Sequence, residues 1–270
     1  MLTSPRSRPD RRRARNPQSL KQEYEEFILQ RIEEFKNGLS RQQLMVIADE
    51  AVRELESEDQ FLLTEMLMLE QVDRLIMRRL KLAPYKKWKE RHLKLRKAQQ
   101  EPTHWGLEGD TPIADLAGRL DDDDLAIFIG SGAAPAALYA AALEAQVLLI
   151  DQDLAAIEAA ENLAAAEAVS SRFQALVVSL GHWLPDANPA LVVLDAKTMA
   201  DLAAGLRGEL VDSLKECTVT GGIHCVLSAE PRADVRSLAP EALQSHYAGW
   251  ALEKPRRPDA RSRWFLATKP

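Results

Sequence analysis

The chain has 270 residues, 46% of them hydrophobic, and a formal net charge of −6. This length accommodates two domains, or one domain with a sizeable extension, and the negative charge excludes a general attraction to nucleic acid. No stretch approaches the roughly twenty apolar residues of a membrane span. The two cysteines stand outside any CxxC pattern, which argues against a disulfide framework or a zinc site. We therefore expect a cytoplasmic protein without a bound metal.

The N-terminal third is predicted to be helical after a basic tail. Residues 1–16 are polar and contain six arginines, so we expect them to be disordered. Residues 17–100 repeat apolar side chains at helical spacing and predict four helices in a small bundle or arm. Asn16, followed by proline, is the expected cap of the first helix, and Ser40 with Gln43 forms a capping box for the second.

The fourth predicted helix, Tyr85 to Lys97, is strongly basic. It and the residues before it carry ten cations: Arg78, Arg79, Lys81, Lys86, Lys87, Lys89, Arg91, Lys94, Arg96 and Lys97. Interleaved with aromatic residues, this pattern permits contacts with nucleic-acid phosphates. It equally describes a solvated helix face whose aromatic residues pack on a neighbour. Both interpretations stay open.

Residues 101–120 contain scattered proline and glycine and predict a linker. Residues 121–270 then alternate strand and helix patterns. We place strands near 125–130, 146–151, 173–178, 190–195, 222–228, 248–253 and 262–268, and helices near 134–144, 153–168, 198–215 and 238–246. The alternation predicts an α/β fold, a Rossmann-like, seven-stranded and mostly parallel sheet that ends in an antiparallel hairpin.

The segment from Asp124 to Asp153 has the order of a nucleotide-cofactor half-site. A strand ends in Gly130-Ser131-Gly132, an alanine-rich helix follows, and a second strand ends in Asp151. Glycine lets a backbone approach a ligand closely, and an acid about twenty residues further on can accept hydrogen bonds from both ribose hydroxyls. Alternatively, Asp151 caps the helix that follows it.

From about residue 107 to 270 the chain resembles class I S-adenosylmethionine (SAM)-dependent methyltransferases, especially the small-molecule and tellurite-resistance-type members. The resemblance rests on the order of four segments: FIGSG, LLIDQDLAAIEAAENLAAAEA, ALVVLD, and the ending HYAGWALEK with WFLATKP. It implies SAM as the cofactor, and it implies cofactor-binding roles for Gly130, Ser131, Gly132, Asp151, Gln152 and Leu180.

The roles implied by this resemblance differ along the cofactor. The glycine turn would border the methionine portion, Asp151 would hold the ribose hydroxyls, and Gln152 would lie beside the adenine. The sequence departs from the family's motifs at three places. Phe128 stands where the family has an acid, Ala134 replaces the third glycine, and no acid follows the third strand. A backbone amide, with Leu180 as the candidate, would replace that last acid.

The catalytic residue is unknown from the sequence, because methyl transfer needs mainly proximity and orientation. A nucleophile that must lose a proton would use His182 or Asp195 as the base. Asp195 could equally cap the end of the fourth strand, with Lys197 as a solvated neighbour. His182 and Trp183 follow the third strand, and the tryptophan is as consistent with a packing lid as with recognition.

The sequence thus predicts a SAM-dependent methyltransferase whose acceptor is unidentified and is expected to be a small molecule. The N-terminal helices would form a lid or a contact with a second copy or another protein. One alternative is a catalytically inactive binding or assembly module with the same fold. Another is a nucleic-acid-binding methyltransferase that uses the basic helix 78–97. No membrane partner is expected.

Overall fold

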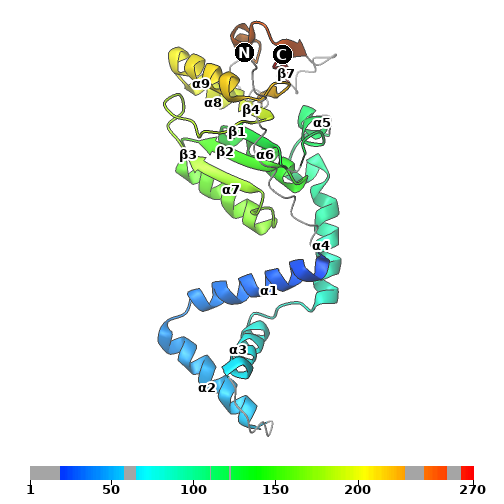
Figure 1. The fold of residues 1–270 in the computed structure, drawn as a ribbon, viewed down its shortest axis with the longest axis vertical. Coiled ribbons are helices and arrows are strands. Elements are labelled where there is room, and N and C mark those ends of the chain that lie inside the picture. The colour runs from blue at the N-terminus through cyan, green and yellow to red at the C-terminus, as the bar shows by residue number, and fades with distance from the viewer. Residues whose placement is uncertain (1–18, 58–64, 110, 122, 229–239, 254–262) are drawn as a thin grey trace, which may run out of the picture. The chain divides into compact units, whose positions relative to one another are not determined.

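The computed structural model describes residues 19–57, 65–109, 111–121, 123–228, 240–253 and 263–270. The chain divides into a helical unit, Met1–Lys94, and an α/β unit, Leu95–Pro270, and each is described by itself (Figure 1). The predicted disordered tail, residues 1–16, lies outside the described residues. Among the described helices, none combines the length and the apolar character needed to cross a bilayer.

The helical unit is built from helices with side-chain caps. Its helices are α1 (Leu20–Asn37), α2 (Arg41–Ser57), α3 (Glu65–Arg79) and α4 (Tyr85–Gln99), the last of which continues past the unit boundary. The hydroxyl of Ser19 accepts from the Gln22 amide, and the Gln22 side chain accepts from the Ser19 amide. Ser40 and Gln43 form the predicted capping box of α2. The first helix begins at Leu20 with Ser19 as its cap, and the predicted Asn16 cap lies outside the described residues.

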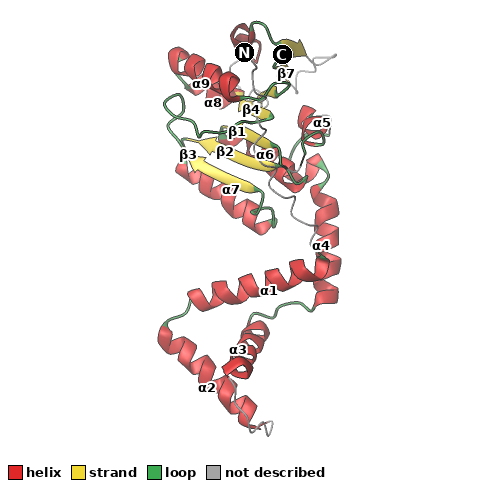
Figure 2. Cartoon of the chain, in the orientation of Figure 1, coloured by secondary structure: helices red, strands yellow, loops and turns green. Residues whose placement is uncertain are grey.

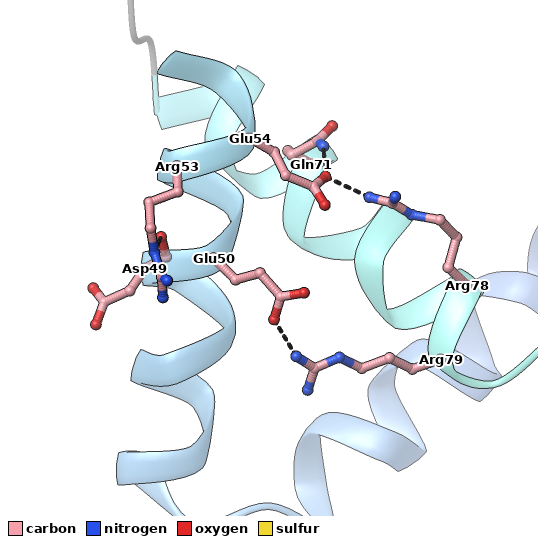
Figure 3. A network of polar contacts seen from close by, with 7 residues as sticks. All are labelled: Asp49, Glu50, Arg53, Glu54, Gln71, Arg78 and Arg79. Carbon is pink, nitrogen blue, oxygen red and sulfur yellow. Dashed lines mark hydrogen bonds and ion pairs between the residues drawn. The ribbon is translucent and has the colours of Figure 1, made fainter. Parts of the chain in front are cut away.

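A small apolar core holds these helices together. It consists of Ile28, Ile32, Ile47, Ala51, Leu75 and Ile76. Each fully buried isoleucine contributes about 1.5–3 kcal/mol by leaving water. Polar pairs join α2 to α3 at the edge of this core (Figure 3). Glu54 accepts from the side chains of Gln71 at 2.6 Å and Arg78 at 2.5 Å, and Glu50 pairs with Arg79.

The α/β unit contains a β-sheet flanked by helices (Figure 2). The sheet has seven strands in the order β3-β2-β1-β4-β5-β7-β6. The strands are β1 (Leu125–Ile129), β2 (Gln146–Asp151), β3 (Phe173–Val177), β4 (Leu191–Asp195), β5 (Ile223–Ser228), β6 (Ala251–Glu253) and β7 (Arg263–Thr268). β1 to β5 are parallel, whereas β7 runs antiparallel to both β5 and β6. The predicted fold class and the closing hairpin are confirmed.

Helices cover both faces of the sheet, which explains why its central strands are apolar throughout. The helices of the unit after α4 are η1 (Pro102–Trp105), α5 (Pro112–Ala117), η2 (Ser131–Ala133), α6 (Ala134–Ala142), α7 (Leu154–Ala166), α8 (Ala196–Asp201), α9 (Ala204–Cys217) and η3 (Pro240–Tyr247). Successive side chains of β1 point to opposite faces of the sheet. Phe128 joins the core formed with α5, α6 and α7, and Ile127 and Ile129 join the core formed with α8, α9 and η3.

Two predicted helices differ in the structure. The segment predicted as one helix, 198–215, forms α8 and α9, because Leu202 adopts an extended backbone with ψ 142° and ends α8. The segment predicted as a helix at 238–246 is the 3-10 helix η3 in its described part.

The segment predicted as a linker, residues 101–120, is folded into the α/β unit. Trp105 is buried, and its indole nitrogen donates to the Gln99 carbonyl at 2.9 Å. Ile113 and Leu116 of α5 are buried in the core beside α6. These large apolar side chains lose contact with water only when packed against the sheet layer, so the segment is a structural part of this unit.

Candidate functional site

The sheet order brings three strand ends together at one edge. β1 lies between β2 and β4, and the chain leaves β1 toward β2 but returns on the other side at β4. Such a switch point opens a crevice at the carboxyl ends of the strands, where open α/β sheets bind ligands. The glycine turn after β1, Asp151 at the end of β2 and Asp195 at the end of β4 all fall there.

The glycine turn packs tightly against the end of β4 and the start of α8. Gly130 has φ +95°, and a Cβ built on it would lie 2.7 Å from the Cβ of Thr198. A Cβ on Gly132 would lie 2.6 Å from the carboxyl carbon of Asp195. Both glycines are thus required by the chain's own packing, because no real Cβ tolerates such distances.

Asp151 joins the glycine turn to the end of β2. Its carboxylate is buried and accepts hydrogen bonds from the amides of Ser131 and, at 2.9 Å, Asp153. The helix that follows is capped by Asp153, which accepts from the amides of Ala155 and Ala156. The alternative in which Asp151 caps α7 is therefore wrong. A carboxylate offers about four acceptor positions, and the described structure uses two of those on Asp151.

Asp195 ends β4 and is the N-cap of α8, a helix that begins earlier than the one predicted at 198–215. It is buried and accepts from the amides of Lys197 at 3.4 Å and Thr198 at 3.1 Å, and from the Thr198 hydroxyl at 2.8 Å. Of about four acceptor positions, one remains once these three bonds are made. Asp195 therefore contacts the glycine turn from the β4 side, as Asp151 does from the β2 side.

Of the other predicted site residues, one is buried and the rest are exposed. The Leu180 side chain is buried in the core beside α8 and α9, and its amide has no hydrogen-bond acceptor among the described residues. His182 and Gln152 are exposed, and Trp183 is 58% exposed. The structure thus brings together the glycine turn and the two aspartates, and it leaves His182 and Gln152 on the surface.

Phe128 belongs to the hydrophobic core rather than to this edge. Its ring is fully buried in the cluster that includes Leu149, Val193 and residues of α6. The proline that follows Ala134 occupies the first turn of α6, where its missing amide hydrogen costs nothing. The fold therefore accommodates both Phe128 and this proline.

A buried polar network that the sequence did not predict lies beside β5. The Thr218 hydroxyl donates its one hydrogen to the Leu214 carbonyl at 2.6 Å, so Nε2 of His224, 2.8 Å away, must donate to Thr218. Nδ1 of His224 then accepts from the Tyr247 hydroxyl at 2.9 Å. Burial, with Lys215 and Lys269 nearby, lowers the pKa of His224 to about 3, so the ring is neutral and structural.

Two cavities lie away from the candidate site. A cavity of about 320 Å³ lies at the opposite, amino-terminal ends of the strands, next to Asp124, Ala190 and Gly222. A second cavity, of about 610 Å³, lies in the helical unit. In the part of the chain that the structure describes, no cluster of three or more His, Cys, Asp or Glu side chains is arranged to hold a metal ion.

Several solved methyltransferase structures are similar to this chain. No protein-family model and no curated protein matches the sequence. The chain is similar to TehB from Haemophilus influenzae, with 18% identity, a TM-score of 0.47, and coverage of 61% of this chain and 63% of that one. It thus covers less than two thirds of TehB.

Two further solved structures are similar at comparable levels. The glycopeptide N-methyltransferase MtfA, complexed with SAM, has 15% identity, a TM-score of 0.47, and coverage of 58% of this chain and 92% of that one. An rRNA methylase from Streptococcus thermophilus has 12% identity, a TM-score of 0.44, and coverage of 58% and 93%. The α/β unit has a Rossmann-like sheet in which the antiparallel strand β7 lies between β5 and β6.

Proposed function

We propose that the α/β unit binds SAM at the carboxyl edge of its sheet and is a methyltransferase. The observation that carries this proposal is the bonding of Asp151. Its buried carboxylate is held by two backbone amides, and about two acceptor positions are left. Two is the number of hydroxyl donors on a ribose, and the position at the end of β2 is where such an acid belongs in this fold.

The residues of this edge fit the remaining groups of the cofactor. Asp195, with about one acceptor position left, would accept from the ammonium group in place of the acid that Phe128 replaces. The Leu180 amide, which has no hydrogen-bond acceptor among the described residues, would donate to an adenine ring nitrogen. Gly130, Ser131 and Gly132 would border the methionine portion, and Gln152 would lie beside the adenine. When bound, SAM supplies an activated methyl group on a sulfonium.

The chain's contribution to transfer would be to bind and orient, because a neutral leaving group needs no acid. Where an acceptor must lose a proton, we propose His182 as the base. It is exposed in the loop after β3, whereas Asp195 already accepts three hydrogen bonds as a helix cap. A base must be free to accept the proton it removes.

Calorimetry with SAM and S-adenosylhomocysteine tests the cofactor proposal. We expect micromolar binding of both by the full chain, and at least tenfold weaker binding by Asp151→Asn, which removes the charge from the ribose acceptor. Asp153→Asn is the matched control, because asparagine caps α7 as well as aspartate does and the affinity should not change. Equal losses in the two variants, or no heat with either ligand in the folded wild type, would refute the proposal.

A second candidate is a catalytically inactive module with this fold. The observation in its favour is that the space beside Gly132 is filled by the Asp195 carboxylate. Under this alternative the glycines serve packing alone, and Asp195→Ala would leave the heat of mixing with SAM at zero. Binding of SAM by the wild type would exclude a module that has lost its cofactor.

A further inference from the structure

One face of α4 carries cations without carboxylate partners. Between residues 86 and 94 the exposed cations are Lys86, Lys87, Lys89, Arg91 and Lys94, and the one acid in this stretch is Glu90. In the described structure none of these five forms an ion pair, whereas Arg78 and Arg79 of α3 are neutralised by Glu54 and Glu50. The α4 face is therefore a concentrated positive region in a chain of net charge −6.

The spacing of these cations suits a regular polyanion. Lys87, Arg91 and Lys94 stand at i, i+4 and i+7, so they form one stripe along the helix. The stripe is about 10 Å long at 1.5 Å per residue. One strand of a nucleic acid presents about three phosphates over that length.

A cavity of about 610 Å³ in the helical unit adds an aromatic element next to the start of α4. It is lined by Tyr85, which lies on the side of α4 opposite the stripe, and by Tyr24, whose ring meets the Tyr85 ring at 5.4 Å. Three cations of α3 and the following turn also line it, Arg74, Arg78 and Lys81, together with one carboxylate, that of Glu54. Arg74 and Arg78 pair with acids, and Lys81 is exposed with no carboxylate partner among the described residues.

We propose that the α4 stripe and this cavity bind a single strand of nucleic acid that passes around the start of α4 at Lys86, with phosphates on the stripe and a base against the tyrosines. Aromatic faces beside a basic groove are the usual means of holding unpaired bases. The inference rests on the proposed function only in that this strand would carry or accompany the methyl acceptor. Binding itself requires no cofactor.

The same surface fits other polyanionic partners less well. A helix that lies in a membrane surface needs an apolar face, and on the exposed face of α4 the one large apolar side chain is Leu93. The carboxylates of an acidic protein segment would pair with the cations. Such a segment has no base to stack against the two tyrosines that line the cavity. The observations therefore favour nucleic acid.

Fluorescence anisotropy with a labelled twelve-nucleotide RNA, and with DNA of the same sequence, tests the inference on the full chain without SAM. We expect binding whose logarithmic dependence on salt has a slope of at least about −2, since single strands give about −0.7 per phosphate neutralised. The triple variant Lys87→Gln, Arg91→Gln, Lys94→Gln should reduce that slope by about 2 and weaken binding at least tenfold.

The matched control removes three exposed cations of α1 and α2 instead, with Lys21→Gln, Arg31→Gln and Arg53→Gln, and should retain wild-type binding. Tyr85→Leu should weaken binding while leaving the salt slope unchanged, because it removes a stacking face and no charge. Tighter binding of RNA than DNA, or the reverse, identifies the strand.

Equal loss in the control triple variant, or equal binding of polyglutamate or of vesicles rich in phosphatidylserine, would overturn the inference. Because no cofactor is present, such a result leaves the calorimetric test of SAM binding intact. Conversely, absence of SAM binding leaves this measurement valid.

Discussion

Nδ1 of His224 and the hydroxyl oxygen of Tyr247 lie 2.9 Å apart in the interior of the α/β unit. The hydroxyl donates to the ring, since the other ring nitrogen is committed to Thr218. Protonation of His224 would place a second hydrogen against that donor and bury a charge near Lys215 and Lys269.

This arrangement makes the stability of the α/β unit depend on pH. Burial lowers the pKa of His224 from 6.5 to about 3, so below pH 6.5 the unfolded chain binds a proton that the folded chain does not. We expect full stability above pH 6.5 and a loss of up to about 1.4 kcal/mol per pH unit as the pH falls toward 3. Thermal unfolding between pH 7 and pH 4.5 measures it. His224→Gln should flatten this dependence, and His182→Gln, at an exposed position, should retain it; the same slope in all three proteins would contradict the assignment.

Gly132→Ala should disturb the candidate site. The new methyl group would lie 2.6 Å from the carboxyl carbon of Asp195, so the turn or the helix cap must shift, at a cost of about 1–3 kcal/mol. Gly205→Ala is the control, because it lies in α9 with open space around the new Cβ and should stabilise by about 0.5–1 kcal/mol. Urea unfolding compares the two, and a neutral Gly132→Ala would show that the turn has room.

Trp105→Ala should strongly destabilise the α/β unit. The residue lies in the segment predicted as a linker, yet it is 8% exposed and bonded to Gln99. Loss of a buried tryptophan costs about 3–5 kcal/mol. Trp183→Ala, which removes a side chain that is 58% exposed, should change the free energy of unfolding by less than about 0.5 kcal/mol. Equal effects would mean that residues 101–120 do not belong to the folded unit.

Ser40→Ala should weaken α2 in the helical unit. The Ser40 hydroxyl accepts from the Gln43 amide, and removal of such a cap costs about 1 kcal/mol. Circular dichroism at 222 nm during heating measures the change. Ser40→Asp preserves a capping oxygen and should unfold close to the wild-type temperature.

The strands were predictable because their apolar runs are dictated by burial on both faces. β1, predicted at 125–130, is Leu125–Ile129, and β4, predicted at 190–195, is Leu191–Asp195. The glycine turn and Asp151 were found by the same pattern, since a strand that ends in glycine is followed by a second strand that ends in an acid. The cap at Asp153 was not separated from Asp151, because two aspartates two residues apart carry the same local signal.

Features that depend on distant residues were not predictable. The His224 network joins positions 218, 224 and 247, which meet only after the sheet has formed. The break between α8 and α9 falls at Leu202 and Ala203, so no glycine or proline marks it. In residues 101–120, proline and glycine indicated a linker although Trp105 and Ile113 carried the opposite signal.

The side chain of Asp195 has a mechanical consequence for any ligand at the sheet edge. It holds the first turn of α8 and fills the space beside Gly132 at the same time. A molecule that displaced this carboxylate would release the start of α8. Binding of such a molecule would then be detected as faster hydrogen exchange of the Lys197 and Thr198 amides at the start of α8.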